Sequence, residues 1–176
     1  VSLPLAATLY LFFLGWDYYL DPHSLLYTLA VRLPFSFLAV AVFGFTFLKS
    51  FERWSQPVLG VTVVLGATGI AIVLAILPHG FGYGTPGLLL VLLSAYSAPR
   101  HLLRTATVSC LAIIAVSDGT LWAAQASSLE FFNTNVFLIA ASVIGLSYTT
   151  LLEWTERHAF ELEEGLRHEK KISDTM

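Results

Sequence analysis

Two ionisable side chains lie where a membrane hairpin would bring them together. Asp17 lies near the end of one apolar run and Arg32 near the start of the next, with the turn residues Asp21 and Pro22 between them. Because an unpaired charge is costly in hydrocarbon, we expect an Asp17–Arg32 ion pair at the outer membrane boundary. Such a pair has two interpretations: a structural clasp of the hairpin, or the polar floor of a ligand pocket open to the outside.

Asp118 is a third candidate ligand-binding residue. It precedes Trp122, a residue type common at membrane interfaces, so its carboxylate can stay hydrated or join Asp17 and Arg32 in one cluster. A further arrangement is a divalent cation on the outer face, because carboxylate and imidazole groups suit such an ion. Its ligands would be Asp21, His23 and Glu130.

The residue patterns that usually carry catalysis are absent from the sequence. It has no Gly-rich phosphate loop, no Cys/His metal spacing, no HExxH and no nucleophile elbow. We therefore expect no catalytic residue, no metal and no cofactor in this chain. The composition also gives no sign of nucleic-acid binding.

The composition indicates a lipid environment. Of 176 residues, 56% are hydrophobic and 12% charged, whereas about a quarter of an average soluble domain is charged. A membrane-spanning helix needs about 20 mostly apolar residues. Six such runs predict an all-α membrane protein whose transmembrane domain covers residues 1–154, with spans at roughly 3–19, 26–48, 58–77, 84–98, 102–124 and 135–154. We expect residues 78–86, rich in Gly and Pro, to form a loop.

Basic residues fall on alternate connections between these spans. Lys49 and Arg53 lie in the second connection, Arg100 and Arg104 flank the fourth, and Arg157 follows the last span. Because lysine and arginine favour the cytoplasmic side, we expect both termini in the cytoplasm and the protein in the inner (plasma) membrane.

The last span continues into a charged segment, residues 155–176, that we predict to be a cytoplasmic exit helix. A short heptad-like seam, with spacings of three and four, is formed by Ala159, Leu162, Leu166 and Glu169. The segment is either a weak coiled coil between two copies or a solvated amphipathic helix. Small residues favour a homodimer through the sixth span, because they let helices approach closely; they are Ala140, Ala141 and Gly145.

Polar landmarks with their spacing connect the chain to a known family. Those near the exit helix are Asn133 to Phe137, Gly145, Tyr148, Leu152, Glu153, Arg157, Phe160, Leu162, Glu163 and Glu169 to Lys171. Those in the front part are Asp17 to Pro22, Arg32, Gln56, Pro57 and Tyr96. In these landmarks the chain resembles the membrane domain of bacterial class III adenylate cyclases with six membrane spans.

The resemblance implies a membrane anchor and receptor that regulates an attached cyclase, which converts ATP to cyclic AMP as a homodimer. The ligand would be a lipid or small hydrophobic molecule, and Mg or Mn would belong to the catalytic domain outside this chain. The resemblance and the seam together give five candidates for transmitting a signal: Glu153, Arg157, Phe160, Leu162 and Leu166. Two alternatives remain open: the sensor of a diguanylate cyclase or histidine kinase, and a small membrane transporter.

Overall fold

The structure is a computed structural model that describes residues 2–49, 51–97 and 103–173, the last eight of them by their backbone alone. All the secondary-structure elements of this part of the chain are helices, as the composition predicts. They are α1 Ser2–Phe12, α2 Leu14–Leu20, the short 3₁₀ helix η1 Pro22–Ser24, α3 Leu25–Phe45, α4 Phe51–Ile76, α5 Gly80–Ser97, α6 Leu103–Ala123 and α7 Ser128–Ser173. Arg100 lies outside the described residues.

Four helical segments in the described ranges are long and apolar enough to cross a membrane: Pro22–Phe45, Arg53–Ile76, Leu103–Ala123 and Ser128–Gly165. The other two predicted spans are shorter. The first run is divided at Phe13 into α1 and α2, and the apolar helix of the fourth run covers Gly80–Tyr96.

The prediction of a loop over residues 78–86 is wrong, because α5 begins at Gly80 and contains Pro86. The chain reverses instead at His79, whose φ of 54° lies in the left-handed region. Glycine serves close packing here: a Cβ at Gly80 would overlap the backbone of Leu74, and one at Gly84 would overlap the Leu74 side chain. These glycines therefore let α5 approach α4, which a single sequence does not reveal.

The start of α7 also differs from the expectation, because the helix begins at Ser128 rather than at 135. Ser127 and Glu130 form a reciprocal capping box: the Ser127 backbone N–H donates to Glu130 Oε2 at 2.9 Å, and the Glu130 N–H donates to Ser127 Oγ at 3.3 Å. Glu130, predicted to lie in a connection, is thus part of the first turn of α7.

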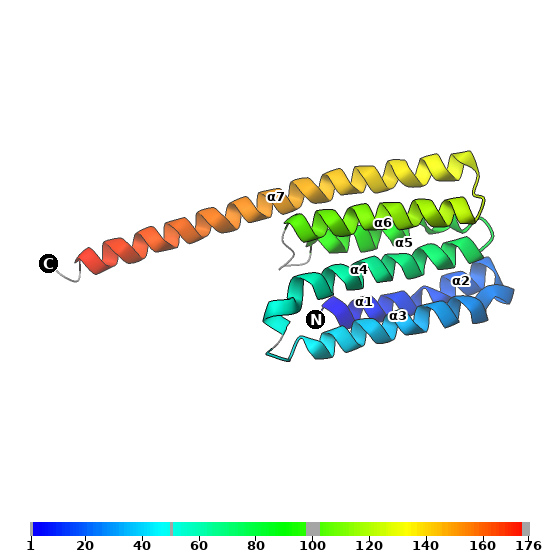
Figure 1. The fold of residues 1–176 in the computed structure, drawn as a ribbon, viewed down its shortest axis with the longest axis horizontal. Helices are drawn as coiled ribbons and strands as arrows, with labels where there is room; N and C mark the ends of the chain where they lie inside the picture. Colours follow the sequence, from blue (N-terminus) through cyan, green and yellow to red (C-terminus); the bar gives the residue numbers. More distant parts are fainter. Residues whose placement is uncertain (1, 50, 98–102, 174–176) are drawn as a thin grey trace.

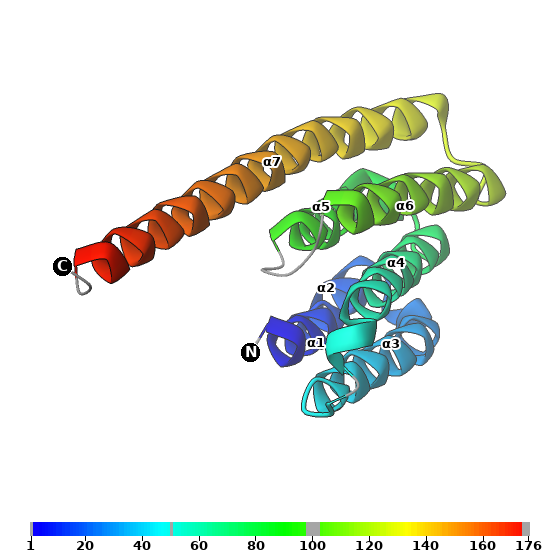
Figure 2. The ribbon, with the colours of Figure 1, turned by 60° about the vertical axis from the view of Figure 1, so that its left-hand side comes forward.

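The helices lie side by side, and α7 extends far beyond the others (Figure 1). The chain's N-terminus and the α3–α4 connection lie at the end of the bundle from which α7 emerges, which we call the exit end (Figure 1). The opposite end, called the hairpin end, carries η1 and the α4–α5 and α6–α7 connections. In Figure 2, α1 to α3 lie on one side of α4, and α5 to α7 on the other.

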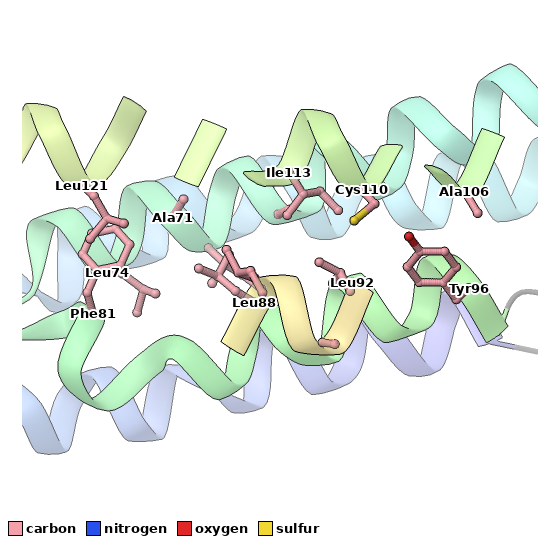
Figure 3. Packing of buried hydrophobic residues seen from close by; sticks show 14 residues of the cluster. Ala71, Leu74, Phe81, Leu88, Leu92, Tyr96, Ala106, Cys110, Ile113 and Leu121 are labelled. Carbon is pink, nitrogen blue, oxygen red and sulfur yellow. The ribbon is translucent and has the colours of Figure 1, made fainter. Parts of the chain in front are cut away.

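The hydrophobic core is built by α4, α5, α6 and α7 (Figure 3). Its most deeply buried large side chains include Leu88, Leu92, Ile113 and Leu138, each 0% exposed. Gly145 of α7 belongs to this packing, because a Cβ there would overlap the ring of Tyr96 from α5. The expectation that Ala141 and Gly145 face a second copy is therefore wrong: Ala141 lies in the core and Gly145 against Tyr96.

This packing predicts that Gly145→Ala destabilises the bundle. The added methyl group overlaps the Tyr96 ring, and overpacking of this kind costs about 1–3 kcal/mol. The measurement is the free energy of unfolding in detergent micelles. Gly119→Ala in α6 is the matched control, since nothing lies within 4 Å of a Cβ there; it should be neutral or slightly stabilising. Equal effects of the two substitutions would contradict the packing described.

Candidate functional site

The predicted Asp17–Arg32 contact is present as a buried, bidentate ion pair. Arg32 Nε donates to Asp17 Oδ2 at 2.7 Å and Nη2 donates to Oδ1 at 2.8 Å. The third guanidinium nitrogen, Nη1, donates to the backbone carbonyl of Tyr10 at 3.1 Å, and the guanidinium carbon lies 4.8 Å from the centre of the Tyr10 ring. The pair thereby ties α3 to both α1 and α2.

The surroundings of this pair resemble a clasp more than the floor of an open pocket. Asp17 is 1% and Arg32 4% exposed, and the two carboxylate oxygens each accept from the guanidinium. Planar, two-point pairing of this kind is the strongest geometry for an Arg–carboxylate contact. A direct role of Asp17 and Arg32 in ligand binding stays a prediction.

Asp118 lies apart from the clasp. Its carboxylate accepts a hydrogen bond from Asn135 Nδ2 at 2.7 Å, which joins α6 to α7. The helices that α6 contacts most are α4, α5 and α7, whereas the clasp belongs to α1, α2 and α3. Of the two possibilities for Asp118, a single cluster with Asp17 and Arg32 therefore does not fit these contacts.

The three residues considered for a cation do not form a site in the described part of the chain, where no group of three His, Cys, Asp or Glu side chains could hold a metal ion. Asp21 instead caps η1: its carboxylate accepts from the Ser24 hydroxyl and from the His23 backbone N–H. These hydrogen bonds lower the pKa of Asp21. Glu130 is engaged in the capping box of α7.

At the exit end, α7 binds backbone groups at both ends of the α5–α6 connection. Thr149 Oγ1 lies 3.1 Å from the Tyr96 carbonyl oxygen, to which it donates, and Glu153 Oε1 accepts from the Leu103 backbone N–H at 3.0 Å. Carbonyls in the last turn of a helix and N–H groups in the first turn lack partners within the helix. Side chains of α7 thus satisfy one free group of α5 and one of α6.

We call this set the exit junction: Tyr96, Leu103, Gly145, Thr149 and Glu153. Gly145, Thr149 and Glu153 follow one another at intervals of four, which places them on one face of α7. The negative charge of Glu153 beside the first turn of α6 also suits the positive end of that helix dipole. The exit junction thus joins the last turn of α5 and the first turn of α6 to one face of α7 through two hydrogen bonds and the Tyr96 ring.

Beyond the junction, the predicted transmission residues lie on the exposed part of α7. Arg157 Nη2 approaches Glu153 Oε2 at 3.8 Å, a loose contact, and its side chain is 79% exposed. Phe160 and Leu162 are 67% and 69% exposed. The Leu166 side chain lies outside the described residues, although the helix backbone continues to Ser173.

The roles of Thr149 and Leu103 in the exit junction were not predicted from the sequence. Threonine in a membrane helix usually bonds to its own helix, as Thr149 also does with the Gly145 carbonyl at 3.0 Å. The usable signal was the spacing of four from Gly145 through Thr149 to Glu153.

Comparison with known families identifies the chain. The MASE8 family model matches residues 15–167, which is most of the sequence. The chain therefore belongs to the MASE8 family of membrane-associated sensor domains. No curated protein and no solved structure matches it.

The clasp predicts a large loss of stability for Arg32→Met. The substitution leaves Asp17 buried without its partner, and removal of one member of a buried pair costs about 3–5 kcal/mol. The measurement is the free energy of unfolding in micelles. The double variant Asp17→Leu/Arg32→Met should recover much of the loss, because it leaves no uncompensated charge.

Arg157→Met is the matched control, because it removes an arginine from an exposed ion pair, where little energy is at stake. If Arg32→Met were as mild as Arg157→Met, the clasp would not hold α3 to α1 and α2.

Proposed function

We propose that this sensor domain is the membrane anchor and receptor of a class III adenylate cyclase, and that the exit junction transmits its state to the catalytic domains. The observation that carries the proposal is the exit junction itself. One uninterrupted helix is bound to the end of the sensor bundle and then leaves it. A signalling connector needs this continuity between the part that senses and the part that responds.

The topology of the proposal is six membrane crossings, with α1 and α2 together as the first and α5 as the fourth. The clasp joins α2 to α3 at the hairpin end, so the divided first helix is anchored where it meets the second crossing. Because α1 begins and α7 leaves the bundle at the exit end, an even number of crossings between them fits this arrangement. Lys49, Arg53 and Arg104 lie near this end, and by the positive-inside rule they favour a cytoplasmic exit end in a plasma-membrane protein.

The exposed part of α7 supports a homodimer. Leu138, Gly145 and Leu152 are spaced by seven residues, and the same spacing continues to Ala159 and Leu166. Within the bundle this face packs on the neighbouring helices, with Leu138 in the core and Gly145 against Tyr96. Beyond the bundle the same face has no neighbour among the described residues. A second copy of the helix is the partner that a continued heptad pattern favours.

The identity of the attached catalytic domain rests on the resemblance of the polar landmarks to those of class III adenylate cyclases. Their active sites form between two catalytic domains, so a change in the pairing or rotation of two exit helices can alter activity. Mg or Mn would serve chemistry in those domains. A diguanylate cyclase or histidine kinase output would use the same junction.

The experiment inserts residues after Arg157 in the full-length protein and measures cyclic AMP formation by membranes supplied with ATP. A four-residue insertion shifts the heptad phase and should change activity at least severalfold. A seven-residue insertion keeps the phase and should leave activity close to that of the unaltered protein. It is the matched control for added length.

Three results would count against the proposal. Equal activity of all forms would exclude coupling through the register of α7. Formation of cyclic di-GMP or phosphohistidine instead of cyclic AMP would replace the cyclase by one of the other outputs. Ion or solute flux through liposomes containing the chain would favour a transporter.

A further inference from the structure

A small cavity lies where α1 and α3 meet α4 and α5. Its volume is about 130 Å³, and most of its wall is aliphatic or aromatic, with Phe35, Leu38, Val63 and Val91 among the lining residues. Among the described residues, no charged side chain lines it. The wall also carries four hydroxyl-bearing residues: Tyr10, Ser36, Thr62 and Ser94.

These four residues fall into two classes. Thr62 Oγ1 donates to the Val58 carbonyl at 2.7 Å, and Ser94 Oγ donates to the Val91 carbonyl at 2.7 Å. The buried hydroxyl oxygens of Tyr10 and Ser36, in contrast, have no hydrogen-bond partner. Ser36 is only 6% exposed. Buried polar groups almost always have a partner, so two such hydroxyls on one cavity wall call for an explanation.

Tyr10 is held firmly at this wall. Its ring packs edge-on against Phe35, with 6.5 Å between ring centres, and faces the Arg32 guanidinium on another side. Its hydroxyl lies against Gly69, where an added Cβ would come within 2.5 Å of it. Ser36 follows Arg32 by one turn of α3. The cavity therefore adjoins the clasp, and its two free hydroxyls come from helices that the clasp joins.

We propose that this cavity binds a small, uncharged molecule with an apolar body and one hydroxyl or carbonyl oxygen, which hydrogen-bonds to Tyr10 and Ser36. The volume suits a body about the size of a benzene ring. The absence of charge on the wall disfavours an ion, because a buried ion needs a charged or metal partner. An apolar lining with a few polar groups that fix orientation is typical of small-molecule sites.

The position of the cavity deepens the proposed function, on which this part of the inference rests. Val91 and Ser94 belong to α5, and Tyr96, two residues after Ser94, binds α7 in the exit junction. An occupant that pushes on α5 at this level would move the carbonyl and ring that hold α7. The ligand site and the junction would thus be linked by one rigid turn of helix.

The test titrates the 176-residue chain in phosphatidylcholine nanodiscs with cyclohexanol and follows methyl-group NMR signals. Signals of Val63 and Val91, which line the cavity, should shift to saturation. The signal of Val143, which is 60% exposed on α7, should not follow that curve. Cyclohexane, which lacks the hydroxyl and so both hydrogen bonds, should bind at least about tenfold more weakly.

Variants distinguish the two classes of hydroxyl. Tyr10→Phe and Ser36→Ala should each weaken cyclohexanol binding about tenfold, and neither removes a hydrogen bond that holds the fold. Thr62→Val is the matched control, because its hydroxyl is already bonded within α4, and it should bind like the unaltered chain. Ala39→Leu should fill the cavity and abolish binding while the methyl spectrum of the folded chain is retained.

Some outcomes would overturn the inference, and one would separate it from the cyclase proposal. Shifts that never saturate and are equal at Val143 would mean partition into the bilayer only. Equal affinity for cyclohexanol and cyclohexane, or no effect of Tyr10→Phe and Ser36→Ala, would mean that the hydroxyls bind nothing but water. Saturable binding in a protein that forms no cyclic AMP would keep this site and remove the cyclase proposal, so the two failures are distinguishable.

Discussion

Hydrocarbon offers no hydrogen bonds, so each polar group inside a membrane domain must find its partner in the protein. This constraint explains why several polar side chains of this bundle join helices, while others bond to their own helix. The clasp joins α3 to α1 and α2, and Asp118 with Asn135 joins α6 to α7. At the exit end, Thr149 and Glu153 satisfy backbone groups of α5 and α6. Apolar packing fills the space between these ties and, at Gly80, Gly84 and Gly145, sets how closely the helices approach.

Among the described residues, several of these ties involve α7. Along one face it meets Thr85 through Thr134, Cys110 through Ser142, Tyr96 through Gly145 and Thr149, and Leu103 through Glu153. Figure 3 shows the Tyr96 hydroxyl directed toward Cys110, so the same tyrosine also contacts α6. The helix that leaves the bundle is therefore also tied to α5 and α6 by hydrogen bonds at several levels. No hinge separates these ties from the exposed part of α7, since the helix runs unbroken from Ser128 to Ser173.

The sequence predicted the features that follow from local pattern and from the cost of a lone charge. The apolar runs predicted the helices. The predicted hairpin brought Asp17 and Arg32 together, so each charge had one nearby partner of opposite sign. The start of α7 was predicted at 135 and lies at Ser128, because the capping-box spacing of Ser127 and Glu130 was not used in the prediction. The start of α5 could not be predicted from the sequence, since Gly80 and Gly84 act through Leu74 of another helix. Nor could the sequence show that Thr149 has a partner on α5 or that Ser36 has none, because both depend on how the helices approach one another.

The most direct test of the junction is amide hydrogen exchange at Leu103 and along residues 155–165 of the chain in nanodiscs. We compare Thr149→Val/Glu153→Ala with the control Thr150→Val/Glu156→Ala, in which Thr150 bonds only within its own helix, to Leu146, and Glu156 is exposed. Loss of the junction should speed exchange at Leu103 by about tenfold or more and change protection in the exposed helix, whereas the control pair should leave both as they are. If Leu103 exchanged equally fast in all three forms, Glu153 and Thr149 would not hold the α5–α6 connection, and coupling of the bundle to α7 through this junction would be contradicted.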